Sequence, residues 1–201
     1  SASSALIQMN EDGSVKFNVG GIDYGQGTYT VLAQIIAERL HIPLEKVHVV
    51  NETNTDTAPY DWQTVASRMT VLAGNAIIEA CDDLVEQIYE LGAIVLHAGK
   101  HELAIGDQCV YVKQHPENML PYNKIAIGYV YSNGNSIGGP LIGRGKSIAQ
   151  GLSFLDQATG QGKPALDWTF GAHGIELEVD KNTGDIEILK IASAFDVGHV
   201  M

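Results

Sequence analysis

Apolar residues recur every three or four positions between Met69 and Ile88, and this run restricts the folds open to the chain. The spacing predicts a long amphipathic helix, whose apolar face must pack against another element. That face comprises Met69, Leu72, Ala73, Ala76, Ile77, Ala80, Leu84 and Ile88. The opposite face carries the carboxylates Glu79, Asp82, Asp83, Glu86 and Glu90. We expect these carboxylates to be solvated, rather than to serve as metal ligands or acid–base groups.

Strands are predicted where apolar and polar residues alternate. Residues 6–19 alternate around Glu11-Asp12-Gly13-Ser14, which is typical of a hairpin. Residues 101–112 predict strands around Gly106-Asp107, and residues 174–194 predict a closing hairpin with its turn at 180–185. A short strand is also expected around Val47 and Val49.

A second amphipathic helix is predicted by the stripe Val31, Leu32, Ile35, Ile36 and Leu40. A short helix is expected over residues 121–131, because proline suits a first helical turn. The glycine-rich residues 132–163 are expected to form a long irregular connection. These elements predict a mixed α/β (α+β) fold of sheet hairpins and two main amphipathic helices, in a single partial domain over residues 1–201.

The net charge of −12 argues against broad binding to nucleic acids or anionic membranes, because the field of the chain repels both. No apolar run approaches the length of a membrane span, and the N-terminus lacks a signal-peptide pattern. Cys81 and Cys109 form no C-x-x-C pattern, which predicts a reduced, cytoplasmic protein. The chain begins at Ser1 without methionine, and both ends are expected to be cut from a longer protein.

The turn Gly25-Gln26-Gly27 leads directly into Thr28 and the second predicted helix. Glycine lets a backbone approach a ligand closely, and a helix start has amide donors and a positive dipole end. These features favour a site for phosphate or another anion. Gln26 adds a side chain that both donates and accepts hydrogen bonds, as a heterocyclic ligand requires.

A second junction of this kind lies at Thr64-Val65-Ala66-Ser67-Arg68. Ser67 is placed to cap the long helix, and the planar fork of Arg68 suits a phosphate. Two such helix starts are able to converge on one extended phosphorylated ligand. The alternative, that each is only a tight turn and a helix cap, stays open from spacing alone.

Three stretches, in order, resemble the second molybdopterin-binding segment of the xanthine dehydrogenase and aldehyde oxidoreductase family: residues 21–28 (GIDYGQGT), 42–47 (IPLEKV) and 64–68 (TVASR). The resemblance continues in later stretches at 170–173 (FGAH), 176–180 (ELEVD), 183–184 (TG) and 196–198 (DVG). The matching motifs span nearly the whole chain.

The resemblance implies that two sets of residues contact the pterin cofactor. The first set is Gly25, Gln26 and Gly27, and the second is Ala66, Ser67 and Arg68. Met69 stands where some members have a second serine. The cofactor implied is molybdopterin with molybdenum, in the cytosine dinucleotide form that bacterial members usually carry.

The family hydroxylates heterocycles or aldehydes with water as the oxygen source, and a glutamate in a G-E-P-P-like motif acts as the general base. No such motif occurs in this chain, so we expect no catalytic residue and no direct metal ligand here, and no activity from the chain alone. The resemblance also implies a small-molecule substrate and iron–sulfur (2Fe-2S) and flavin (FAD) partner domains or subunits.

Two alternatives belong to other functional classes. Residues 139–147 (GPLIGRGKS) nearly match a P-loop of nucleotide hydrolases, but one residue too many separates the glycine from the lysine. The chain is also compatible with a non-catalytic interaction module, and retention of molybdenum and pterin by the purified parent protein would favour the enzyme over this alternative.

Overall fold

A computed structural model describes residues 1–51 and 54–199 of the chain. Residues 52–53 lie outside this range, within a stretch over residues 51–62 that is predicted from its polar sequence to follow the strand at Val47 and Val49. Residues 200–201 at the end of the chain lie outside it as well. Contacts between residues gather into two compact units, Ser1–Ala149 and Gln150–Met201. The single domain expected over residues 1–201 stays a prediction.

The first unit contains a four-stranded sheet with the order β3-β2-β1-β9. Its strands are β1 (Ala2–Met9), β2 (Val15–Val19), β3 (Val47–Val49) and β9 (Ile142–Ile148). β1 pairs antiparallel with both β2 and β9, whereas β2 and β3 are parallel. Alternate residues of β1 and β2 are buried, as the alternating sequence requires, so the predicted hairpin is confirmed.

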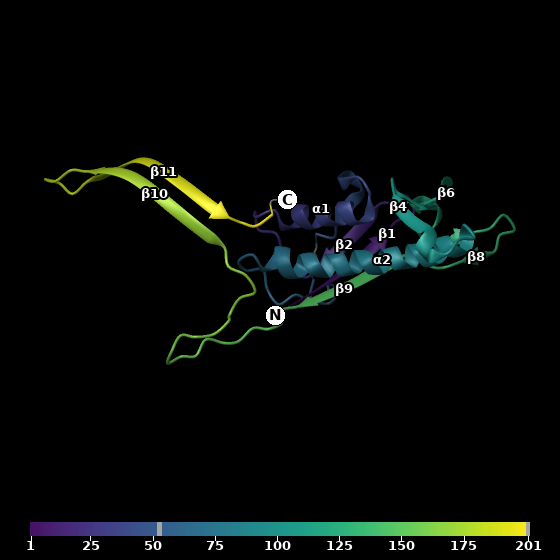
Figure 1. The fold of residues 1–201 in the computed structure, drawn as a ribbon, viewed down its shortest axis with the longest axis horizontal. Helices are drawn as coiled ribbons and strands as arrows, with labels where there is room; N and C mark the ends of the chain where they lie inside the picture. Colours follow the sequence, from purple (N-terminus) through teal and green to yellow (C-terminus); the bar gives the residue numbers. More distant parts are fainter. Residues whose placement is uncertain (52–53, 200–201) are drawn as a thin grey trace. The chain divides into compact units, whose positions relative to one another are not determined.

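Both predicted helices are confirmed, as α1 (Thr28–Leu40) and α2 (Gly74–Val95). A π-helical turn, η2 (Met69–Ala73), precedes α2. Figure 1 shows α2 as the long helix running along β9, with α1 beside it. The apolar faces of both helices and the inner face of the sheet form one core of fully buried side chains, among them Ile7, Phe17, Leu32, Ile36, Ile77, Leu84 and Ile88. Within the described residues, no helix has the length and apolar character needed to cross a membrane.

The carboxylate face of α2 is exposed to solvent as expected, apart from the half-buried Asp83, and two of its members also bond to strand β9. Asp83 Oδ2 accepts a hydrogen bond from the Arg144 amide (2.9 Å), and Glu79 Oε2 accepts one from the Lys146 amide (3.1 Å). These carboxylates therefore cap the outer edge of β9. The remaining members of the face form exposed ion pairs, Asp82 with Arg39 and Glu86 and Glu90 with Lys100.

The prediction of an irregular connection over residues 132–163 is wrong where strand β9 forms. The glycines of β9 explain why its sequence lacks the apolar pattern of a buried strand. A Cβ at Gly143 would overlap the carbonyl oxygen of Ala80, and a Cβ at Gly145 would overlap that of Ala76. Glycine thus lets α2 pack directly on the strand. The P-loop-like stretch forms this strand rather than a loop before a helix, so it does not have the geometry of a P-loop.

A second sheet of the first unit has the order β4-β5-β6, with β4 (Leu103–Gly106), β5 (Cys109–Val112) and β6 (His115–Pro121). The predicted turn between β4 and β5 is confirmed. The remaining short elements are η1 (Leu44–Lys46), η3 (Lys100–Glu102), η4 (Tyr122–Lys124), β7 (Tyr129–Val130) and β8 (Ser136–Ile137).

The helix expected over residues 121–131 is wrong, because only the single 3₁₀ turn η4 forms there. The chain then turns at Gly128, where φ is +101°, and Tyr129 pairs with Ile137. A left-handed residue cannot continue a right-handed helix.

The second unit contains the predicted closing hairpin, with strands β10 (Phe170–Val179) and β11 (Ile186–Asp196). The pairs Val179 with Ile186 and Ile175 with Ile191 lie on one face of this ribbon, and the register shifts by a bulge between Glu176 and Leu177. At the turn, Asp180 Oδ1 accepts a hydrogen bond from the Asn182 amide (2.7 Å).

Candidate functional site

The loop before α1 is organised around Asp23. Its Oδ1 atom accepts hydrogen bonds from the amides of Gly25 (2.9 Å) and Gly27 (3.3 Å), and Oδ2 accepts one from the amide of Tyr29 (3.1 Å). These bonds, led by the one from Gly25, hold the pKa of the Asp23 carboxyl below its ordinary value of 3.8. The sequence predicted amide donors free for an external anion. The structure corrects this, because an internal carboxylate occupies three of them.

Gln26 stabilises the same loop through its side-chain amide. Nε2 donates to the Ile22 carbonyl (3.2 Å) and to Thr28 Oγ1 (2.8 Å), while Oε1 accepts a hydrogen bond from the Tyr24 amide (2.8 Å). The donor and acceptor capacity noted in the sequence is therefore used within the loop. A contact between Gln26 and the cofactor stays a prediction.

Gly25 and Gly27 turn the loop with φ angles of +115° and +81°, conformations that side chains disfavour. A Cβ built at either residue would have no atom within 4 Å. The Cα faces of both glycines are thus open, and a flat ligand could approach the backbone there. Close approach of a ligand to the backbone is the property for which the sequence analysis selected these two glycines.

The second predicted segment contains a guanidinium that is directed inward. Arg68 Nη1 lies 2.6 Å from Asp61 Oδ1, and the two side chains are only 8% and 1% exposed. The other acceptors around the guanidinium are Ser1 Oγ, the carbonyl oxygens of Ala2 and Gln63, and Ser3 Oγ. The guanidinium of Arg68, which was expected to bind a phosphate, instead donates to oxygen atoms of the chain itself. A contact between Arg68 and the cofactor stays a prediction.

The turn beside Arg68 has an exposed, strained backbone. Ala66 has a φ of +45°, which is uncommon for a residue with a Cβ. Ser67 is exposed, and its carbonyl accepts the Val71 amide (3.4 Å) at the start of η2. The N-cap residue of η2 is Arg68, with no side-chain cap bond, so the capping role predicted for Ser67 is wrong. Strained turns and π-helical turns are frequent at functional sites.

The two junctions lie side by side. The Ile22 amide donates to Thr64 Oγ1 (2.9 Å), and the Tyr24 hydroxyl donates to the Thr64 carbonyl (3.3 Å). A Cβ at Gly21 would overlap the end of the Met69 side chain. Residues 21–24 therefore pack on Thr64 and Met69, which flank the predicted segment 66–68. The contacts are made by residues next to the predicted segment 25–27, and a shared site for the two segments stays a prediction.

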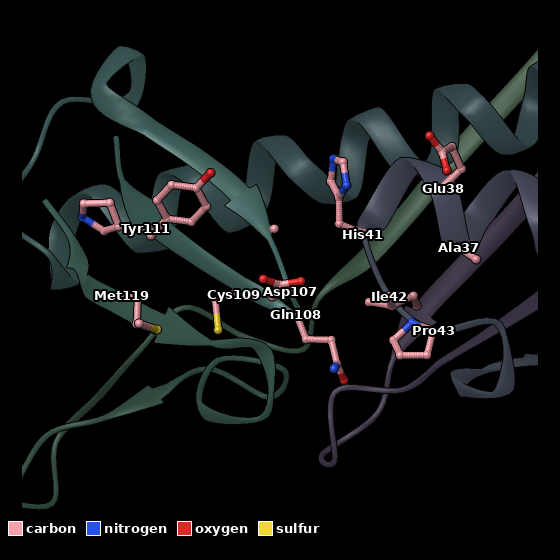
Figure 2. A pocket seen from close by; sticks show the side chains of 12 residues that line it. Ala37, Glu38, His41, Ile42, Pro43, Asp107, Gln108, Cys109, Tyr111 and Met119 are labelled. Carbon is pink, nitrogen blue, oxygen red and sulfur yellow. The ribbon is translucent and has the colours of Figure 1, made fainter. Parts of the chain in front are cut away.

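A cavity of about 790 Å³ lies elsewhere, between the end of α1 and the β4–β5 turn, and the sequence analysis did not find it. Figure 2 shows Glu38 and His41 on the α1 side and Asp107 and Cys109 on the other. Burial, and then the charge of Asp107, raise the pKa of the Cys109 thiol, so this thiol is not activated as a nucleophile. None of the predicted cofactor residues lines it. Nowhere in residues 1–51 and 54–199 do three or more His, Cys, Asp or Glu residues gather as metal ligands.

Comparisons with known proteins match nearly the whole chain. A family model described as a molybdopterin cofactor-binding domain matches residues 1–201. The xanthine dehydrogenase of Oryza sativa subsp. japonica is 28% identical over 96% of this chain and 12% of its own length. The xanthine dehydrogenase molybdenum-binding subunit of Escherichia coli O157:H7 is 28% identical over 98% of this chain and 24% of its own.

Among solved structures, CO dehydrogenase from Oligotropha carboxidovorans is similar, with a TM-score of 0.77 and 26% identity. The match covers 98% of this chain and 22% of that one. The chain thus spans less than a quarter of the length of each of these relatives. The α/β fold expected from the sequence is confirmed by the helices and sheets and by this likeness.

Proposed function

The chain belongs to the molybdopterin cofactor-binding domain family, and from this premise we propose that residues 25–27 and 66–68 together bind one molybdenum cofactor. The observation that carries the proposal is the packing of residues 21–24 on Thr64 and Met69. In this proposal, the two neighbouring loop-to-helix junctions together form the surface that a ligand with a ring system and a phosphorylated arm requires.

The residues present fit such a ligand mainly through their backbone. Gly25 and Gly27 have open Cα faces, and Ala66 holds a left-handed turn next to the exposed Ser67 hydroxyl. We assign contact with the cofactor to these four residues. Gln26 and Arg68 act on the same surface by maintaining its shape, since their polar atoms are bonded within the chain. When bound, the cofactor would supply the redox chemistry of hydroxylation.

The parent protein is proposed to be a xanthine dehydrogenase-like molybdenum hydroxylase of the cytoplasm, acting on a heterocycle or an aldehyde. The cytosine dinucleotide form of the cofactor and the 2Fe-2S and FAD partners are part of the same proposal. The name of the bacterial relative, a xanthine dehydrogenase molybdenum-binding subunit, supports the molybdenum and the assembly from subunits. The dinucleotide form and the identity of the partners are expected from the family resemblance. The catalytic glutamate would come from outside the 201 residues, so the chain alone would be inactive.

The test is the replacement Gln26→Ala in the full-length protein that carries this chain. Without the three side-chain bonds of Gln26, the loop loses its fixed shape, and we expect molybdenum and pterin content to fall more than thermal stability. Gln114→Ala, at an exposed turn, is the matched control and should leave both unchanged. Unchanged molybdenum content in Gln26→Ala would contradict the role of this loop. Absence of molybdenum and pterin from the wild-type protein would favour the interaction module.

A further inference from the structure

We propose that Asp23 is a positioning residue for the molybdenum cofactor. Its carboxylate binds the amides of the loop, and this holds the loop in the shape in which the Cα faces of Gly25 and Gly27 are open. This inference rests on the proposed function. Asp23 was not among the residues nominated from the sequence, and nothing in the family resemblance assigns it a role here.

The geometry of the loop carries the inference. One carboxylate accepts three amide hydrogen bonds from residues two, four and six positions along the chain, those of Gly25, Gly27 and Tyr29. These bonds close the loop into a ring around Asp23 and tie it to the first turn of α1. Both glycines inside the ring have positive φ angles, so without the carboxylate their backbone would have many other conformations available.

The position of Asp23 also links the two junctions. Its neighbours Ile22 and Tyr24 each bond to Thr64, two residues before Ala66. A change in the loop conformation at Asp23 would therefore act on the contact between the two cofactor segments. A carboxylate that only capped the start of α1 would not affect the contact between the two segments.

The chain offers a matched control in Asp180. This residue also sits in an exposed turn, where Oδ1 accepts hydrogen bonds from the amides of Asn182 (2.7 Å) and Thr183 (3.2 Å). In both residues these amide bonds hold the pKa of the carboxyl below its ordinary value. Asp180 lies in the β10–β11 turn, outside both cofactor segments. It therefore separates a general effect of losing a turn carboxylate from an effect on the cofactor.

The experiment compares Asp23→Ala, Asp23→Asn and Asp180→Ala in the full-length protein, with molybdenum and pterin measured per polypeptide. We expect Asp23→Ala to weaken cofactor retention about tenfold, as loss of a supporting residue behind a binding group does. Asp23→Asn should lie between Asp23→Ala and wild type, because its side-chain oxygen still accepts from Gly25 and Gly27. Asp180→Ala should retain the wild-type content.

A second readout is the thermal unfolding of the same proteins after the cofactor has been removed. Positioning predicts similar midpoints for Asp23→Ala and Asp180→Ala. Wild-type retention in Asp23→Ala, or equal losses in Asp23→Ala and Asp180→Ala, would overturn the inference and leave the proposed function standing. A wild-type protein that contains neither molybdenum nor pterin would overturn both.

Discussion

The loop over residues 20–29 and the turn over residues 61–69 lie against each other, but they hold their shapes by different means. In the loop, Asp23 and Gln26 bond to nearby backbone atoms at the protein surface. In the turn, the buried ion pair between Asp61 and Arg68 ties the segment to the start of β1. One junction is thus fixed locally and the other through the core of the unit.

This difference separates stability from ligand binding. Changes in the turn would leave a buried charge without a partner, so they should destabilise the whole unit. Changes in the loop alter groups that water can solvate, so they should act mainly on the shape presented to the cofactor. Variants in the turn should therefore mainly lower the stability of the folded unit, whereas variants in the loop should mainly lower cofactor retention.

The largest effect is expected for Asp61→Ala, which leaves the Arg68 guanidinium unpaired where it is 8% exposed. Breaking a buried ion pair in this way costs about 3–5 kcal/mol of unfolding free energy. Urea unfolding of the chain measures it. Asp82→Ala breaks the exposed pair with Arg39 and should cost only about 0–1 kcal/mol. Equal losses in the two variants would contradict the comparison.

The contact between the junctions is tested by Gly21→Ala. The added methyl group would overlap the side chain of Met69, which is 3% exposed, so the variant should lose about 1–3 kcal/mol. Shortening the neighbour in the double variant Gly21→Ala/Met69→Ala removes the overlap. Its loss should therefore be smaller than the sum of the two single losses. Strict additivity in urea unfolding would indicate that the junctions are not in contact.

A smaller effect is expected for Gly27→Ala, where the obstacle is backbone conformation rather than space. The φ angle is +81° and no atom lies within 4 Å of the new methyl group, so the cost is about 1–2 kcal/mol. Gly139→Ala is the control, because that site is equally open and has no positive φ. Thermal unfolding should separate the two, and equal midpoints would remove the argument for a strained loop.

The smallest effect concerns the pH dependence contributed by Asp23. Folding lowers the pKa of its carboxyl, so the carboxylate stabilises the folded state above the ordinary pKa of 3.8. This contribution is lost as the pH falls through the folded-state pKa. The unfolding midpoint of the wild type should therefore exceed that of Asp23→Asn at neutral pH, and the difference should vanish in acid. A difference that grows on acidification would have the wrong sign.

Much of the fold was predictable because periodicity reports burial. The apolar stripe from Met69 to Ile88 required a helix, and the alternation in β1 and β2 required a hairpin. Strand β9 was missed because Gly143 and Gly145 replace the apolar residues that mark a buried strand, and only the packing of α2 explains them.

That the two junctions are neighbours agrees with the sequence interpretation, whereas their binding of a cofactor stays a prediction and the roles of individual side chains were not visible. Arg68 was predicted to meet a phosphate because arginine suits that ligand, whereas its partner Asp61 becomes evident only in three dimensions. Asp23 had a local signal, an aspartate two residues before a glycine, which is typical of side-chain-to-backbone turns.

The central claim is that both junctions contact one cofactor, and a structure of the full-length protein with its molybdenum cofactor bound would test it most directly. We predict cofactor atoms in contact with Gly25 or Gly27 and also with Ala66 or Ser67. A cofactor that contacts only one of these segments, or that lies in the cavity beside His41 and Asp107, would contradict the account.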